Sequence, residues 1–276
     1  MLIKLLKGLA PVAALAAGSL VAGCDQMDIQ IGDSKGVPLA ELDMAGAAPT
    51  ELVLAAPDKV IVTTGDALDI EVTGDQEAVD AMRFHLDDDS LGITRAKDSG
   101  KNIGSATVRV TMPSLTAMVI AGSGSVEADR MTGRAEATIA GSGSAKVNSM
   151  DVDSLDLTIA GSGDFETTGS AATLDLTVAG SGQSRMAGLK VGNADISVAG
   201  SGDAEFDSDG KVEASIVGSG SVTVNGNASC TVSSVGSGKL NCRSGTTAAS
   251  EKPEAPKAPE SPEAPEAPEA PEAPST

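Results

Sequence analysis

The stretch LDLTIAGSGDFET at residues 155–167 decides the fold, because close copies of its central part recur along half of the chain. The Gly-Ser-Gly triplet in it occurs seven times, always after Ala or Val. The triplets begin at Gly122, Gly141, Gly161, Gly180, Gly200, Gly218 and Gly236. Their intervals are 18 to 20 residues, and a nearly constant period of this length with short alternating segments is typical of a β-solenoid.

The residues around each triplet alternate in character, as they do in a strand with one buried face. Apolar residues stand two, four and six positions before the first glycine, which in this stretch are Ile159, Leu157 and Leu155. Alternation resumes after the triplet, from Phe165 onward. We therefore predict an all-β, single-stranded parallel β-helix with turns of about 19 residues over 116–245. Each turn would contain a strand, a Gly-Ser-Gly corner, a second strand and a return of variable length.

The corner itself explains why glycine is repeated. We expect its first glycine to need a positive φ, or to leave no room for a Cβ against the next turn. Stacking at about 4.8 Å per turn would place the corner serines in a ladder whose hydroxyls can bond to one another. A phosphate-binding loop is the disfavoured alternative, because such a loop occurs once, precedes a helix and carries a lysine.

The N-terminal residues 1–23 have the pattern of a secretion signal. Lys4 and Lys7 precede an apolar stretch that is too short to cross a membrane. The stretch ends in LVAGC, which resembles the lipobox of bacterial lipoproteins, so Cys24 would become the first mature residue and carry the lipid. The chain would then be held at a membrane by acyl chains such as palmitate. The alternative is a signal peptide cut elsewhere, which would leave Cys24 as a free thiol.

The rest of the chain divides into a linker at 24–39, one domain at 40–245 and a tail at 246–276. The tail repeats proline with Glu and Ala, so we expect it to be disordered and extended, either a plain solvated tail or a tether through the cell wall. The composition includes 32 Gly, three Phe, one His and no Trp or Tyr, which predicts a thin aliphatic core. The net charge of −20 argues against nucleic acid as a partner.

Corners of the form AGSG, preceded by strands such as LDLTI, resemble those of the head GIN domain family, described as putative auto-transporter adhesins. The upstream stretch DKVIVTTGDALDIEVTGDQEAVDAMRFHLDDDSLGITR is similar to the strand-rich start of that domain. The resemblance covers residues 40–245. It implies a right-handed β-helix exposed in the bacterial cell envelope, and it supplies no catalytic residues. The last two corners read VGSG, which we interpret as the end of the stack.

Two cysteines fall on inward positions of the last turn. Cys230 lies six residues before Gly236 and Cys242 lies six residues after it. Because an envelope protein folds in an oxidising compartment, we predict a disulfide that closes this turn. Two buried thiols are the alternative.

The outward position five residues before each corner is acidic in five consecutive repeats. These residues are Glu136, Asp156, Asp175, Asp195 and Glu213. Carboxylates stacked in this way repel one another, so the first interpretation is a solvated, repulsive face. The second is a stripe of weak Ca²⁺ sites shared between turns, since Ca²⁺ binds carboxylate oxygens. We predict no other cofactor.

These patterns predict a lipid-anchored, non-enzymatic module of the bacterial envelope that acts in structure or binding. An envelope protein or a surface glycan is the expected partner, and the choice between periplasm and cell surface, or inner and outer membrane, is left open. The alternative is a β-helix enzyme that acts on polysaccharides. It is disfavoured because the chain has one histidine, His85, and acids where an anionic sugar would need cations.

Overall fold

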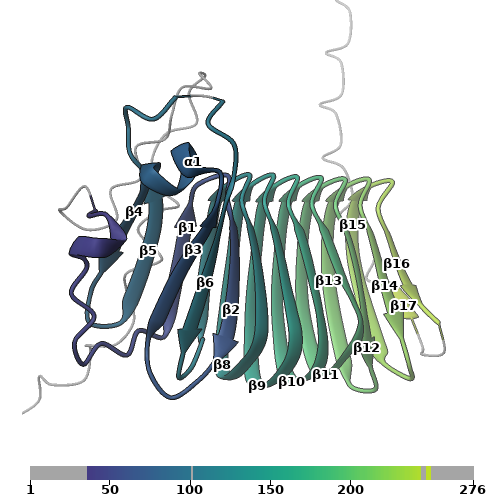
Figure 1. Ribbon diagram of the computed structural model, residues 1–276. Helices are drawn as coiled ribbons and strands as arrows, with labels where there is room; N and C mark the ends of the chain where they lie inside the picture. Colours follow the sequence, from purple (N-terminus) through teal and green to yellow (C-terminus); the bar gives the residue numbers. More distant parts are fainter. Residues whose placement is uncertain (1–35, 101, 244–246, 250–276) are drawn as a thin grey trace, which may run out of the picture.

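The computed structural model describes residues 36–100, 102–243 and 247–249, and this part of the chain forms one long β-solenoid (Figure 1). Nearly all of its strands pair in parallel with the same segment of the neighbouring turn, so the predicted fold class is confirmed. The predicted signal peptide, Cys24 and nearly all of the predicted tail lie outside the described residues.

The regular part of the stack runs from β7 to β17. The four strands β8 to β11 each start after one corner, pass through the return and end at the next corner (Figure 1). The bounds are β7 Ala117–Gly122, β8 Ser125–Gly141, β9 Ser144–Gly161, β10 Asp164–Gly180, β11 Gln183–Gly200, β12 Asp203–Ser208, β13 Lys211–Gly218, β14 Ser221–Asn225, β15 Ser229–Gly236, β16 Lys239–Cys242 and β17 Thr247–Ala249. The register between β8, β9, β10 and β11 shifts only in the return, which therefore absorbs the differences in repeat length, as predicted.

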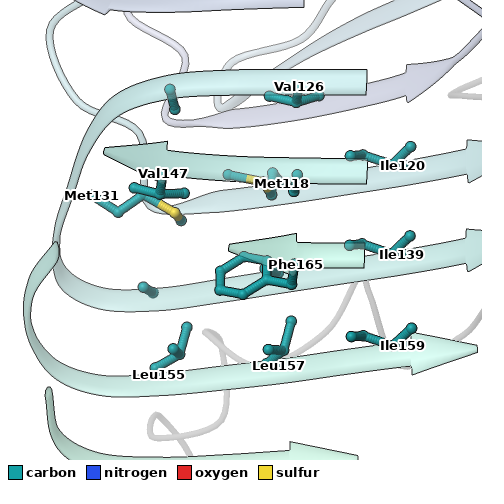
Figure 2. Packing of buried hydrophobic residues seen from close by; sticks show 14 of the residues in the cluster. Met118, Ile120, Val126, Met131, Ile139, Val147, Leu155, Leu157, Ile159 and Phe165 are labelled. Carbon is teal, nitrogen blue, oxygen red and sulfur yellow. The ribbon is translucent and has the colours of Figure 1, made fainter. Parts of the chain in front are cut away.

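The core is a set of aliphatic columns that run along the solenoid axis. Ile120, Ile139 and Ile159 lie one above another on successive turns, and Leu157 packs beside them (Figure 2). All three phenylalanines of the chain are buried in this core as well, including Phe165. Burial of such side chains contributes about 1.5–3 kcal/mol each, and stacking them shares that burial between turns.

Positive φ is found at all seven corners, and a close approach to the preceding corner is found at every one except Gly122. The first glycine of each of the seven corners has a φ between +111° and +129°. At Gly161 a Cβ would also collide with the carbonyl oxygen of Gly141 in the preceding turn. The backbone joins the corners, because the N–H of Ser162 donates to the oxygen of Gly141 at 2.8 Å.

The predicted ladder of serine hydroxyls is wrong. The corner serines are exposed, and in the part of the chain that the structure describes no side-chain hydrogen bond joins one of them to the next. The physical reason is that backbone N–H and C=O groups already make the contacts between corners, so the hydroxyls are left to water.

The N-terminal end departs from a simple stack, because its turns are out of chain order. The strands there are β1 Glu51–Ala55, β2 Lys59–Thr64, β5 Ser90–Arg95 and β6 Ala106–Met112. β1 pairs in parallel with both β5 and β7, and β2 pairs in parallel with both β6 and β8. The turn that comes first in sequence is therefore inserted between two later ones. The Gly-Ser-Gly period begins only at Gly122 and could not predict this order.

An antiparallel cap covers the outer edge of the β5–β6 turn. Its elements are η2 Leu39–Glu41, β3 Asp69–Gly74, α1 Gln76–Ala81 and β4 Met82–Leu86. β3 pairs antiparallel with β6, and β4 pairs antiparallel with β5 (Figure 1). Because β3 and β4 pair with the backbone groups of the β5–β6 turn, that turn cannot pair edge to edge with another molecule.

A buried ion pair joins the β5–β6 turn, which we call the cap turn because the cap strands pair with it, to the inserted turn formed by β1 and β2. The corner between β1 and β2 carries Asp58 where the regular corners have their second glycine, since Ser125 N–H donates to the Asp58 carbonyl as Ser144 N–H does to that of Gly124. The Asp58 carboxylate is fully buried, and Arg95 binds both of its oxygens, at 2.7 and 2.6 Å. The backbone N–H of Ala106 also donates to this carboxylate, at 2.8 Å.

The predicted disulfide between Cys230 and Cys242 is present, and it joins β15 to β16 in the last corner-bearing turn. Cys230 is buried and Cys242 is half-buried. Ser234 is exposed where the other turns have a buried Ile or Val. The disulfide therefore holds together a turn whose own apolar packing is weak.

Replacing both Cys230 and Cys242 with Ser is expected to lower the free energy of unfolding by about 3 kcal/mol, because a closed loop of this length restricts the unfolded chain. Thermal unfolding with and without the double change measures the loss. Mass spectrometry of the unreduced, alkylated protein checks the bond directly. Recovery of both thiols in alkylated form would contradict the prediction.

Candidate functional site: two charged faces of the solenoid

The first candidate site is the acid column, which we define as Glu136, Asp156, Asp175, Asp195 and Glu213. The structure brings all five together, because each is in register with the next on adjacent strands of β8, β9, β10, β11 and β13. Glu51 of β1 continues this column at the N-terminal end, through Ala117 to Glu136. The sequence repeats could not reveal Glu51, because its turn has no Gly-Ser-Gly corner.

Partial burial and the neighbouring like charges both favour the protonated form of carboxylates in this column. Partial burial, and then the Asp156 and Asp195 carboxylates, raise the pKa of Asp175 above its ordinary value. Partial burial followed by Asp156 raises the pKa of Glu136. For Glu51 the causes of a raised pKa are partial burial, Asp89 and Glu136, in that order. The folded chain therefore holds these protons more tightly than the unfolded chain does.

A shallow hollow of about 400 Å³ runs beside the acid column. Asp156, Asp175 and Asp195 form one wall, and the polar residues seven positions before each corner form the other. These polar residues are Ser154, Thr173, Asn193 and Lys211. Lys211 forms an ion pair with Glu213 at 2.6 Å, so a cation closes one end of the hollow.

The hypothesis of Ca²⁺ sites finds no support in this geometry. Within residues 36–100 and 102–243, no group of three or more Asp, Glu, His or Cys side chains is placed to hold a metal ion. Ca²⁺ takes six to eight oxygen ligands that surround it. Carboxylates in a single file along one face of a sheet approach an ion from one side only, so the acid column alone does not supply such a ligand set.

Changing Asp175 to Asn is expected to raise the free energy of unfolding at pH 7 by about 0.2–1 kcal/mol, because two like charges then lose their repulsive neighbour. An acid with a raised folded pKa stabilises the fold fully below its unfolded pKa of about 3.9 and loses that contribution as pH rises through the folded value. The gain should therefore shrink as pH falls toward 4. Thermal unfolding across pH checks it.

The matched control for this prediction is Asp164→Asn on the other side of the corner, where Arg185 lies 3.4 Å from the carboxylate. Removal of that attractive partner should not raise stability. Equal gains from both changes would show that the repulsion is not specific to the acid column.

The second candidate site is the alternating face, formed by the outward residues three and five positions past the first glycine of the five corners from Gly122 to Gly200. The fifth positions read Glu127, Lys146, Glu166, Arg185 and Glu205, in register from strand to strand. The third positions read Ser125, Ser144, Asp164, Gln183 and Asp203, and Lys59 precedes them on β2. Charge of alternating sign thus replaces the uniform charge of the acid column.

Ion pairs join neighbouring turns on the alternating face. Lys146 Nζ lies 2.8 Å from Glu166 Oε1, and Lys59 Nζ lies 3.0 Å from Glu127 Oε2. The hydrogen bond and the attraction between Lys146 and Glu166 raise the pKa of Lys146 and lower the pKa of Glu166. The same residues line a second hollow, of about 340 Å³. The sequence contained this signal at a fixed distance past each corner, but its mixed residue types do not stand out as a repeat.

His85 lies apart from both faces, on β4 of the cap, where its Nε2 is 3.0 Å from Asp87 Oδ1. Neither hollow is lined by His or Cys. Among the residues that the structure describes, no helix is both long and apolar enough to cross a membrane.

Several solved structures share this fold. A crystal structure of a putative adhesin from Bacteroides fragilis NCTC 9343 superposes with a TM-score of 0.67 at 20% identity, over 71% of this chain and 92% of that one. A putative lipid-binding protein from Parabacteroides distasonis ATCC 8503 gives 0.56 at 21%, over 71% and 93%. A putative adhesin from Parabacteroides merdae ATCC 43184 gives 0.55 at 18%, over 71% and 92%.

No curated protein sequence matches this chain. The sequence profile of one family matches residues 48–228, which include the inserted turn, the cap elements β3, α1 and β4, and six of the seven Gly-Ser-Gly corners. The family resemblance that the corners predicted is confirmed. The chain belongs to the family described as putative auto-transporter adhesin, head GIN domain.

Proposed function

We propose that this chain is a lipid-anchored, non-enzymatic module of the bacterial cell envelope that binds an extended partner. The observation that carries the proposal is the repetition of the same charged positions on five successive turns of the sheet. Columns such as Asp156, Asp175 and Asp195 present identical groups at about 4.8 Å intervals. Solenoids use such extended surfaces to bind long partners, whereas an active site usually requires a local break in the pattern.

The acid column favours partner groups that carry positive charge or donate hydrogen bonds. Beside it runs a column of hydroxyls three residues before six of the seven corners, including Thr158 and Thr177, in register on neighbouring strands. Carboxylates and hydroxyls together suit an amine-bearing or hydroxyl-rich surface, such as a glycan or the basic face of an envelope protein. The family's description as adhesins supports the same class of function.

Binding is tested with purified chain immobilised against envelope glycan and envelope protein fractions. The matched variant carries Asn at Asp156, Asp175 and Asp195, which keeps side-chain size and removes the charge. Selective retention of one fraction, lost in this variant, supports the proposal. If the unchanged chain and the triple variant retain the same fraction equally, the acid column is not the binding surface. If a glycan is cleaved during the assay, the chain is an enzyme and the proposal is wrong.

The lipid anchor gives a separate prediction. Cys24→Ser should release the protein from membranes into the soluble fraction, because the serine hydroxyl cannot take the thioether-linked lipid, and each buried methylene contributes about 0.8 kcal/mol to anchoring. Fractionation after labelling with palmitate measures both the lipid and the location. A Cys24→Ser protein that still sediments with membranes would contradict the anchor.

A further inference from the structure

The alternating face has a property that the acid column lacks, which is complementarity to itself. Along the axis its fifth positions carry negative, positive, negative, positive and negative charge, from Glu127 to Glu205. If a second copy is turned end for end, the two columns match in sign when they are displaced by one turn. We propose that two copies of this chain associate side by side, antiparallel, through their alternating faces.

In the displaced register the fifth positions from Glu127 to Arg185 face partners of opposite charge across the interface. Glu127 lies opposite Arg185 of the second copy, and Lys146 lies opposite Glu166 of the second copy. The two-fold axis generates each pair twice, because both copies offer the same surface. A displacement of any odd number of turns matches signs in these columns, so a second column has to select among them.

Lys59 makes that selection. It stands one turn before Ser125 in the column of third positions, on β2. In the one-turn register it falls opposite Asp203 of the second copy. In the register displaced by one turn in the opposite direction, which also matches the fifth positions, Lys59 would instead face Lys239, a like charge. The third positions therefore favour the first of these two registers. Larger displacements leave fewer of the charged fifth positions facing one another.

The charged side chains of this face are exposed enough to contact a second copy as well as their partners within the chain. The side chains of Lys59, Glu127, Lys146, Glu166 and Arg185 are between 40% and 55% exposed. Exposed ion pairs within one chain contribute little, so sharing each charge with a second copy costs little of the existing pairing. Repulsion between acid columns would oppose association through the other face, and the antiparallel cap covers the N-terminal edge.

The occupant is a second copy because of the spacing. The alternation reverses with every turn, at about 4.8 Å. A surface complementary to it must carry charges of alternating sign with the same rise, and another solenoid of this chain has that rise by construction.

Sedimentation equilibrium of the full chain, with Cys24→Ser to leave out the lipid, tests the association. The mass should double as concentration rises through the micromolar range, and added NaCl should return it to that of a single chain, since screening weakens exposed charges. A zero-length carbodiimide should join Lys59 to Asp203 or Glu205. These residues lie five turns apart in one chain, about 24 Å, so this link forms only between chains. A single-chain mass throughout, with no such link, overturns the proposal.

Exchange of charge gives the sharper test. One variant carries Lys146→Glu and Arg185→Glu, and the other carries Glu127→Lys and Glu166→Lys. Each alone should keep the single-chain mass, and an equimolar mixture should double it. The acid column shows that this fold accepts a uniform acidic file, and circular dichroism checks each variant. Asp156→Asn with Asp195→Asn, on the other face, should leave the dimer intact. A doubled mass for either exchange variant alone would contradict the interface. If a variant does not fold, the test is the carbodiimide link in the protein without charge exchange: its presence supports the interface and its absence contradicts it.

Discussion

Asp58→Ala is expected to lower the free energy of unfolding by about 3–5 kcal/mol, because it leaves the Arg95 guanidinium buried without its carboxylate. The side chain of Arg95 is 13% exposed and that of Asp58 is fully buried, so water can replace little of the lost pairing. The Ala106 N–H loses its acceptor in the same step. Since the pair joins the cap turn to the inserted turn, the loss should appear as early unfolding of residues 69–112. Hydrogen exchange and chemical denaturation measure the local and the global effects.

Two controls separate this buried pair from ordinary charge loss. Glu166→Ala removes one partner of an exposed ion pair and should cost at most about 1 kcal/mol. Asp58→Ala combined with Arg95→Met should restore part of the stability, because no unpaired charge then remains in the interior. A double variant as unstable as the two single losses together would show that the ion pair itself is not what holds the cap.

The second large effect is expected at a corner. Gly161→Ala meets two obstacles, because φ is +123° and the new Cβ would collide with the Gly141 carbonyl oxygen. Gly122→Ala meets only the first, since its φ is +111° and no atom lies within 4 Å of the position of its Cβ. The strained φ costs about 1–3 kcal/mol. The collision should add about 1–3 kcal/mol, because both colliding atoms belong to backbone that the stack holds in place.

Thermal and denaturant unfolding of the two alanine variants gives this difference directly. Both must first show the far-ultraviolet circular dichroism of a β protein. If Gly122→Ala is as damaging as Gly161→Ala, then close stacking of the corners contributes nothing and glycine is needed for its conformation alone.

The sequence predicts the repeating part of this molecule well, because one turn contains all the information for the next. The inward columns through Ile159, Leu157 and Leu155 and the partners Cys230 and Cys242 follow from position within the repeat. The inserted turn does not, since Asp58 and Arg95 meet only through the three-dimensional path of a segment without a period. The predicted hydrogen bonds between corner serine hydroxyls are not formed, because backbone N–H and C=O groups make the contacts between corners. The two charged faces are predictable only in part. The positions of their residues follow from the repeat, but which residues form ion pairs depends on the charges that neighbouring turns carry.

The inserted turn limits how this architecture can change in length. At the N-terminal end, β1 and β2 are locked between strands that are made later, so the chain cannot gain or lose a turn there without rebuilding the cap. At the other end the disulfide fixes the last corner-bearing turn. Duplication or deletion is therefore accommodated only in the middle of the solenoid. There, duplication of one turn would place two like charges next to each other at Lys146 or Glu166. Duplication of two successive turns would preserve the alternation of charge. Only an even number of added turns therefore leaves the alternating face unchanged.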